Sequence, residues 1–493
     1  MRVLHVVSEL YPLIKTGGLG DFGFSLPHAL KQLGIDVRLL LPGYGAVLRQ
    51  LKKPRVVGEI DIPGAGKIRR FRVLELLPPG FEVPVWVAEC PALFARPGNP
   101  YVDADGASWP DNAERFTCFA RLAAQLANGA SKAGWKADVV HCHDWQTGLV
   151  PAFLQQQDTP PHSIFTIHNL AYDGRFPLTE FKRLQLPSAW WHAEGVEFYG
   201  SFSMLKAGLV YADAITTVSK TYAREILTPA FGNGMDGVLR NYQHKLRGIL
   251  NGLDPVIWNP GTDTLLARNY GASDREAGRK ANRKALLKEL GWEPSGAATG
   301  RPLFGSVGRL AEQKGIDLLA AAATRLLAQL KAWFVIIGDG EQIYIEQLLE
   351  LQRRFPGQVR VYIGYSERLA HLVEAAADFF VMPSRFEPCG LNQLYSLCYG
   401  TPPVVHNTGG LADTIVDASE ENLANGTATG VVFYQPAADA LHAALVRAVS
   451  LFHDPHFWPQ LQQTAMQQDF GWQESAQQYL SMYKEQMSGS KSI

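Results

Sequence analysis

A glycine-rich loop directly follows the first apolar run of the chain. Residues 3–7 are almost wholly apolar, which predicts a strand buried in a parallel sheet. Residues 15–21 read Lys-Thr-Gly-Gly-Leu-Gly-Asp, and the pattern that follows predicts a helix beginning near Asp21. Glycines let backbone N–H groups approach a ligand, a helix N-terminus favours negative charge, and Lys15 adds a cation. The combination favours a bound anion such as a diphosphate. A tight strand-to-helix turn without a ligand is the alternative.

The same arrangement recurs in the second half of the chain. Residues 303–307 again predict a buried strand, and residues 316–330 show helical spacing. The loop between them carries Arg309 and Lys314, five positions apart. Arginine gives forked hydrogen bonds to phosphate and lysine a compact charge, so the pair suits a departing phosphate group. Two such units, about one domain length apart, predict two half-molecules that serve one polyanionic ligand.

Composition limits the classes of protein to which the chain can belong. At about 100–200 residues per domain, 493 residues predict two large domains or three small ones. A formal net charge of −1 argues against nucleic acid or an anionic membrane as the main partner. The five cysteines form no C-x-x-C pair, which favours reduced thiols and a cytoplasmic location. The first residues lack the apolar core of a signal peptide, and no uncharged apolar run reaches the roughly 18 residues of a membrane span.

Strand-like and helical patterns alternate along most of the chain, which predicts an α/β protein with parallel sheets covered by helices on both faces. Turn-rich residues 251–280 predict the seam between the two halves. In open α/β sheets, ligands bind beyond the carboxyl ends of the strands, so two such domains would face each other across a deep cleft. The predicted strands are residues 3–7, 37–41, 85–87, 139–141, 163–167, 214–218, 303–307, 333–337, 359–362, 379–382, 403–405 and 430–433.

A carboxylate follows one strand of the second half. Residues 384–391 read Ser-Arg-Phe-Glu-Pro-Cys-Gly-Leu, directly after the strand predicted at 379–382. Gly390 and Leu391 would open the next helix and present N–H groups to an anion. Glu387 would face the group to which that anion is attached, or it would be a helix-start carboxylate that favours the dipole. Cys389 is interpreted as a small residue beside the anion loop, because no histidine partner for a nucleophile is visible.

Two motifs invite a metal interpretation. His141-Cys142-His143-Asp144 ends a predicted strand, but no further close His/Asp cluster completes a hydrolase centre. A polar loop that touches the hydroxyl groups of a ligand is the favoured interpretation. Residues 103–105 read Asp-Ala-Asp among turn residues, which favours a turn over a divalent-metal site.

Several of these segments together resemble the bacterial glycogen synthases and plant starch synthases. The resemblance covers nearly the whole chain, in order and at the expected spacing. Its most specific parts are the opening glycine loop and the Glu-Pro-Cys-Gly-Leu run. The segments that carry it are residues 15–21, 141–145, 166–170, 309–315, 384–391 and 408–413.

This resemblance implies a GT-B glycosyltransferase with two Rossmann-like domains across a deep cleft. The implied limits are residues 1–250 for the acceptor-side domain, 251–465 for the nucleotide-sugar domain, and 466–493 for a C-terminal helix that crosses back. The implied reaction is retaining transfer of glucose from ADP-glucose to the non-reducing end of an α-1,4-glucan such as glycogen. No metal or other cofactor, no nucleic acid and no membrane is implied, and the expected location is the cytoplasm.

The resemblance also assigns roles residue by residue. The implied catalytic residues hold the diphosphate or contact the transferred glucose; they are Arg309, Lys314, Glu387 and His168. Further residues would line the diphosphate, sugar, adenine and acceptor subsites. They are Lys15, Gly17, Gly18, Asp21, Tyr101, Asp144, Asn251, Tyr365, Cys389, Gly390 and Leu391.

The sequence departs from the family pattern at two positions. Many relatives carry His where this chain has Gln146, which affects one sugar or acceptor contact. In the wider GT-B group a second Glu often stands eight positions after the first, where this chain has Tyr395, so a carboxylate contact to the ribose is not expected.

Two rival functions remain open at this stage. One is a metal-dependent hydrolase using His141, His143 and Asp144. The other is a glucan-binding protein that kept the fold and lost catalysis, which the presence of Lys15, Arg309, Lys314 and Glu387 disfavours. The choice of ADP over UDP rests on the resemblance alone.

Overall fold

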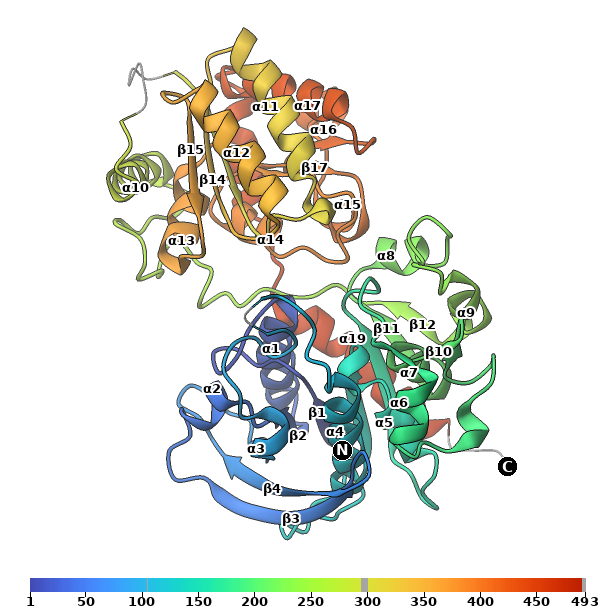
Figure 1. The fold of residues 1–493 in the computed structure, drawn as a ribbon. Coiled ribbons are helices and arrows are strands. Elements are labelled where there is room, and N and C mark those ends of the chain that lie inside the picture. Colours follow the sequence, from blue (N-terminus) through green and yellow to red (C-terminus); the bar gives the residue numbers. More distant parts are fainter. Residues whose placement is uncertain (104, 294–299, 490–493) are drawn as a thin grey trace. The chain divides into compact units, whose positions relative to one another are not determined.

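The computed structural model describes residues 1–103, 105–293 and 300–489, and the chain divides into two compact units (Figure 1). Unit 1 comprises Met1–Gly252 together with Trp472–Ile493, and unit 2 comprises Leu253–Gly471. Three segments lie outside the described residues: position 104 of the Asp-Ala-Asp motif, residues 294–299, and residues 490–493 at the end of the predicted C-terminal segment.

Unit 1 is built on a nine-stranded sheet of described residues, in the order β12-β11-β7-β6-β1-β2-β5-β4-β3. The strands from β12 to β5 are parallel to one another, whereas β3 and β4 form an antiparallel hairpin that extends the sheet beyond β5. The sheet strands are β1 (Arg2–Val6), β2 (Asp36–Pro42), β3 (Arg55–Pro63), β4 (Ile68–Leu76), β5 (Val85–Glu89), β6 (Val139–His143), β7 (His162–Ile167), β11 (Ala214–Thr217) and β12 (Leu246–Gly248).

Helices cover this sheet, and a small second sheet, β8-β10-β9, lies in the same unit. Its strands are β8 (Arg175–Pro177), β9 (Glu197–Phe198) and β10 (Ser201–Ser203). The helices of unit 1 are α1 (Gly18–Gln32), α2 (Gly45–Leu48), α3 (Pro91–Phe94), α4 (Asn112–Ala127), α5 (Val150–Leu154), α6 (Leu178–Arg183), α7 (Met204–Tyr211), α8 (Lys220–Glu225), α9 (Asp236–Asn241) and α19 (Trp472–Ser488).

The C-terminal helix α19 belongs to unit 1, although the residues before it belong to unit 2. Its buried face packs against α1, where the Phe22 ring lies edge-on to Trp472 at 5.5 Å and to Tyr479 at 6.0 Å between centroids. Ser475 Oγ donates to the carbonyl of Leu250 and so ties the helix to the end of the preceding unit 1 segment. Burial of these aromatic side chains is the main force that holds α19 in unit 1.

Unit 2 contains a six-stranded parallel sheet in the order β15-β14-β13-β16-β17-β18. Its strands are β13 (Leu303–Val307), β14 (Trp333–Gly338), β15 (Val359–Ile363), β16 (Phe379–Met382), β17 (Pro403–His406) and β18 (Val431–Phe433). Its helices are α10 (Arg275–Glu289), α11 (Ile316–Gln329), α12 (Gln342–Arg354), α13 (Glu367–Ala376), α14 (Asn392–Cys398), α15 (Gly409–Thr414), α16 (Glu420–Ala424), α17 (Ala438–Phe452) and α18 (Phe457–Met466).

Three sequence predictions need correction. The first helix begins at Gly18 and not near Asp21, because extended Gly17 caps it (φ −159°, ψ −166°). The turn-rich seam ends earlier than residue 280, since α10 begins at Arg275. The sheet of unit 1 is not wholly parallel, because it includes the antiparallel hairpin β3–β4. The strands of this hairpin are half exposed, so their apolar residues alternate with polar ones and do not form the continuous run of a buried parallel strand.

Among the described residues, no helix is both long and apolar enough to cross a lipid bilayer.

Candidate active site

The carboxyl edge of the unit 1 sheet collects the polar residues predicted for this half. The loop before α1 follows β1, Asp144 follows β6, His168 follows β7, and Asn251 follows β12. Because these strands are parallel, their carboxyl ends share one edge of the sheet. The topology therefore places these polar groups at the edge where α/β proteins bind ligands.

Glu9 organises the glycine-rich loop, a role that the sequence analysis missed. Its buried carboxylate accepts from the backbone N–H groups of Thr16 at 2.5 Å and Gly17 at 3.0 Å, and from the Thr16 hydroxyl at 2.5 Å. The hydroxyl of Tyr101 donates to Glu9 Oε1 at 2.8 Å and lies 2.8 Å from Ser8 Oγ. A Cβ on Gly17 would meet no atom within 4 Å, so the space beside the loop is open.

Lys15 stands at the rim of this loop. Its Nζ lies 2.8 Å from Asp21 Oδ1 on the first turns of α1, and both side chains are partly exposed. The ion pair thus holds Lys15 next to the start of α1. An anion bound there would interact with both the charge of Lys15 and the dipole of the helix. An exposed pair of this kind contributes little to stability, about 0–1 kcal/mol, so a ligand exchanges with it at small cost.

Asp144 occupies a strained position between β6 and the following helical turn. Its φ of +56° is unusual for a residue with a side chain. The carboxylate oxygen Oδ1 accepts from the backbone N–H of His168 at 2.7 Å and of Asn169 at 3.4 Å. Burial raises the pKa of this carboxyl to about 7, although both backbone bonds act in the opposite direction. The Asp144 carboxyl therefore fixes the backbone at His168, and this carboxyl is only partly charged at neutral pH.

The His168 ring sits beside other imidazoles. Its Nε2 lies 3.2 Å from Nδ1 of buried His143, and the Phe22 ring lies edge-on to it at 4.7 Å. Burial lowers the pKa of His168 to about 3. The ring is consequently neutral under physiological conditions, and it offers a hydroxyl group one N–H or one lone pair rather than a charge.

Two buried amides near this edge have oxygen atoms without a hydrogen-bond partner in the described part of the chain. They are Asn251 Oδ1 and Gln146 Oε1, and both residues are almost fully buried. Unsatisfied buried acceptors are costly, about 1–3 kcal/mol each, unless a ligand or water donates to them. Sugar hydroxyls are suitable donors to both oxygens.

The corresponding edge of unit 2 joins a cation to a carboxylate. Lys314, in the turn after β13, has its Nζ 2.6 Å from Oε2 of Glu387, which follows β16. Ser384 Oγ donates to the same carboxylate oxygen at 2.9 Å. Glu387 is buried, and Lys314 is about a quarter exposed. The sequence separated these two residues by 73 positions, and the structure brings them into contact.

Glycines allow the Glu387 loop to be approached closely. Gly409 has φ +47°, and a Cβ there would lie 1.9 Å from the carbonyl oxygen of Glu387. The N–H of Gly410 donates to that same carbonyl at 3.0 Å. On the other side, a Cβ on Gly315 (φ +64°) would lie 2.2 Å from the carbonyl of Pro383. No side chain fits at these positions without moving the backbone that carries Glu387.

The remaining cations of this edge are tied to the same loops. Arg309 Nη2 lies 3.3 Å from Gln313 Oε1, and Gln313 Nε2 donates to the carbonyl of Phe386 at 3.2 Å. Arg385 forms a forked pair with Asp317 at 2.8 and 2.7 Å, which fixes the loop to the first turn of α11. The loops after β13 and β16 therefore form one hydrogen-bonded block.

Other predicted residues of unit 2 lie at the same edge of the sheet. Tyr365 follows β15 and is 75% exposed. Gly390 has φ +71° and precedes Leu391, the residue that caps α14. Cys389 is a buried free thiol whose carbonyl accepts from Gln393 Nε2 at 3.0 Å, which agrees with a packing role.

The metal alternative takes a different form in the structure. His141 and His143 are grouped with His5, and one nitrogen of each lies within 4.8 Å of the others. Asp144 is not in this group. Both ring nitrogens of His141 are engaged, by the hydroxyls of Tyr483 at 2.7 Å and Thr166 at 2.6 Å. The histidines thus bond to protein groups within the core.

The second metal alternative, at Asp103, is a turn. Asp103 accepts from the N–H groups of Asp105 and Ala107 at 3.0 Å each.

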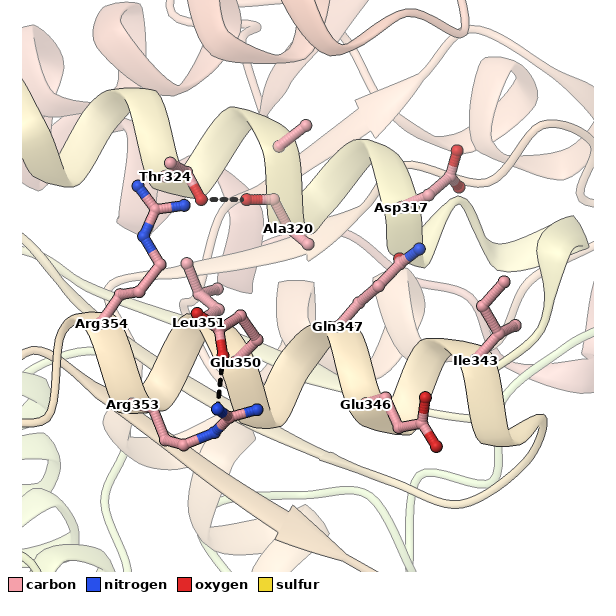
Figure 2. A pocket seen from close by; sticks show the side chains of 11 residues that line it. Asp317, Ala320, Thr324, Ile343, Glu346, Gln347, Glu350, Leu351, Arg353 and Arg354 are labelled. Carbon is pink, nitrogen blue, oxygen red and sulfur yellow. Dashed lines mark hydrogen bonds and ion pairs between the residues drawn. The ribbon is translucent and has the colours of Figure 1, made fainter.

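A separate groove in unit 2 is lined in part by Asp317, the partner of Arg385. It runs between α11 and α12, encloses about 570 Å³, and is lined by side chains such as Ala320, Ile343 and Leu351 (Figure 2). None of the residues predicted to bind substrate lines it. The residues predicted to bind substrate therefore lie at the two sheet edges and not in this groove.

Comparisons with known proteins agree with this geometry. Residues 2–241 match the family model of the starch synthase catalytic domain, and residues 292–455 match that of the glycosyl transferases group 1. A glycogen synthase from Hydrogenovibrio crunogenus is 46% identical over 98% of this chain and 99% of its own length. One from Thioalkalivibrio sulfidiphilus is 49% identical over 99% of this chain and 100% of its own length.

Solved structures extend the likeness to the fold. The catalytic domain of starch synthase IV from Arabidopsis thaliana, bound to ADP and acarbose, superposes with a TM-score of 0.88 at 32% identity and covers 99% of both chains. A sucrose-phosphate synthase from Thermosynechococcus elongatus, at a TM-score of 0.60 and 18% identity, shares the fold alone.

These matches, together with two units built on largely parallel sheets, show the GT-B glycosyltransferase fold that the resemblance implied. The chain belongs to the glycogen synthase family, which confirms the resemblance found in the sequence.

Proposed function

We propose that this enzyme transfers glucose from ADP-glucose to the non-reducing end of an α-1,4-glucan, with retention of the anomeric configuration. The observation that carries the proposal is the contact between Lys314 and Glu387, at 2.6 Å. A cation suited to phosphate stands beside a buried carboxylate suited to sugar hydroxyls, which is what an activated hexose requires at its reacting bond. The starch synthase IV domain from Arabidopsis thaliana was solved bound to ADP and acarbose.

The proposed step is a same-face substitution. The acceptor hydroxyl forms a bond to the anomeric carbon while the bond from that carbon to the diphosphate oxygen breaks. The departing oxygen takes the hydroxyl proton, and Arg309 and Lys314 stabilise the charge that develops on it. Preorganised donors of this kind contribute about 2.7–4 kcal/mol each, more than the roughly 0.3–1 kcal/mol of a helix dipole. The cations of unit 2 therefore carry most of the stabilisation.

The residues of unit 1 supply the sugar side of the proposal. Neutral His168 and the unpartnered oxygens of Asn251 and Gln146 suit the hydroxyl groups of glucose. Lys15 and the N-terminus of α1 suit the diphosphate end of the donor. Tyr365 would stack on adenine and Tyr101 would lie on the acceptor side. In this proposal, residues 1–250 bind the acceptor, 251–465 bind the nucleotide sugar, and 466–493 join the first domain.

We also propose that the enzyme works without a metal and in the cytoplasm. All five cysteines are free thiols, which suits a reducing compartment. The expected cleft between the domains stays a prediction.

The direct test is incorporation of radiolabelled glucose into glycogen from ADP-glucose and from UDP-glucose, with and without EDTA. We expect incorporation from ADP-glucose, preferred over UDP-glucose and unaffected by the chelator. Release of free glucose without growth of the glucan would instead indicate a hydrolase.

A further inference from the structure

A continuous chain of hydrogen bonds crosses the core of unit 1 from the C-terminal helix to the candidate sugar site. His143 Nδ1 lies 3.2 Å from Nε2 of His168, and His143 Nε2 lies 3.3 Å from Nδ1 of His5. On the other side of its ring, His5 Nε2 lies 3.5 Å from the hydroxyl oxygen of Tyr483 on α19. The chain thus joins the last helix of the protein to a residue at the carboxyl edge of β7.

The chain continues beyond Tyr483. The Tyr483 hydroxyl lies 2.7 Å from Nδ1 of His141, and His141 Nε2 lies 2.6 Å from the Thr166 hydroxyl. Thr166 in turn lies 2.6 Å from the hydroxyl of Thr216 on β11. All of these side chains are fully buried, whereas His168 alone is partly exposed.

Burial makes every imidazole of the chain neutral. It lowers the pKa of His5 and His168 to about 3, and it lowers the pKa of His141 and His143 well below the ordinary value. A neutral imidazole has one N–H and one lone pair, and a hydroxyl has a single proton. If one bond of the chain is reversed, all the others must be reversed with it. The tautomer of His168 is therefore coupled to groups that lie several hydrogen bonds away along this chain.

The far end of the chain sets its direction. The Thr216 hydroxyl has Thr166 as its hydrogen-bond partner and no second one among the described residues. If Thr216 donates to Thr166, no buried proton is left without an acceptor; in the reverse direction the Thr216 proton is stranded. With Thr216 as the donor, each member donates to the next, and His168 Nε2 accepts from His143. The proton of His168 then resides on Nδ1, and this atom has no hydrogen-bond partner among the residues that the structure describes.

We propose that His143 is a positioning residue, held by the chain from Tyr483 and Thr216, that fixes His168 as an Nδ1–H donor toward an oxygen of the transferred sugar. The inference rests on the proposed function for the identity of the ligand. Its advantage is physical: a donor whose proton is fixed before the substrate arrives does not have to reorganise when it binds. The chain makes His168 specific for an acceptor atom without placing a charge beside the sugar.

The test compares two tyrosines on the same buried face of α19. Tyr483→Phe removes the hydroxyl that links His5 to His141, whereas Tyr479→Phe removes a hydroxyl one helical turn away that is not a member of the chain. Thr216→Val removes the end of the chain with a side chain of nearly the same shape. Protein labelled with ¹⁵N-histidine reports the tautomer of each ring, and loss of a signal in His168→Ala assigns His168.

We expect a pure Nδ1–H tautomer for His168 in the wild type and in Tyr479→Phe. In Tyr483→Phe and Thr216→Val we expect a mixture, with kcat lowered about two- to tenfold because only the competent tautomer reacts. An Nε2–H tautomer in the wild type, or an unchanged tautomer in both variants, would overturn the proposal. So would one equivalent of zinc in the purified protein that is lost in His143→Ala.

The two readouts separate this inference from the proposed function. If the tautomer responds as expected but the wild type does not incorporate glucose from ADP-glucose, the chain stands and the proposed function fails. If the wild type is active and the tautomer does not respond, the positioning role fails and the proposed function stands.

Discussion

The carboxyl edges of the two sheets are built from different kinds of polar group. In unit 1 the edge holds neutral imidazoles, unpartnered amide oxygens and a carboxyl whose pKa is raised to about 7, with the Lys15–Asp21 pair at its rim. In unit 2 it holds ion pairs, Lys314 with Glu387 and Arg385 with Asp317. The first edge suits uncharged hydroxyl groups, and the second suits a group that gains charge during the reaction.

We propose that the two units divide a single task between them. Burial deep enough to neutralise histidine gives directional donors and acceptors without charge. Partial exposure, as at Lys314, keeps a cation available for exchange between a protein carboxylate and a ligand phosphate. The comparison predicts that substitutions at the two edges affect different steps.

The largest effect is expected at Lys314. Lys314→Ala removes the cation nearest Glu387 and should lower kcat by roughly 10²–10³-fold, because the contact strengthens as charge develops on the leaving group. Lys331→Ala is the matched control, since Lys331 is an exposed lysine of the same unit. Steady-state rates of glucose incorporation measure both. A kcat of Lys314→Ala within threefold of the control would contradict the charged role of this edge.

A smaller loss is expected when the Glu387 loop is displaced. Gly409→Ala forces a Cβ to 1.9 Å from the Glu387 carbonyl, whereas Gly291, with a similar φ of +54°, has open space around it. Gly291→Ala should cost about 1–2 kcal/mol of stability and leave turnover unchanged. Gly409→Ala should in addition lower kcat about 10- to 100-fold, because a small shift of a positioned group is expensive. Thermal unfolding and turnover of both variants decide whether the effect is strain alone.

The third prediction concerns acid stability. His5 and His168 have a folded pKa of about 3, and His141 and His143 are also lowered, so unfolding binds protons between pH 6.5 and 3 and stability falls as pH falls through this window. Asp144 opposes this between pH 4 and 7, because its folded state holds a proton that its unfolded state releases. Near pH 5, His5 and His168 each contribute a loss of about 1.4 kcal/mol per pH unit, and Asp144 offsets about one of these contributions.

Hydrogen exchange read by mass spectrometry measures this separately for the two units. We expect peptides from β1, β6 and β7 to lose protection between pH 7 and 5, while those from β13 and β16 change little. Equal loss in both units would show that the neutral histidines do not distinguish unit 1.

The strands that form the centre of each sheet were predictable because they are buried on both faces. The prediction for residues 303–307 coincides with β13, and that for 163–167 differs from β7 by one residue. The hairpin β3–β4 was missed because its half-exposed strands lack the continuous apolar run by which the central strands were recognised. The glycine loop was recognised, but the start of α1 depends on the bonds to Glu9, which no local pattern reveals.

The site was predictable where a residue follows a strand and carries a distinctive charge, as Lys314 and Glu387 do. Their contact was not, because it depends on which strands are neighbours in the sheet. The histidine chain was also missed, since its members come from four strands (β1, β6, β7 and β11), from the residue that follows β7, and from the last helix. One signal was present: His5 is a polar residue inside an apolar strand, and buried polar residues require partners.

The most direct test of this division of labour is the affinity for ADP, measured by titration calorimetry on the wild type, Lys314→Ala and His168→Ala. If unit 2 holds the diphosphate and His168 contacts only the sugar, Lys314→Ala weakens ADP binding at least tenfold, whereas His168→Ala binds ADP as the wild type does and loses glucose transfer. Equal weakening of ADP binding in both variants would contradict the account.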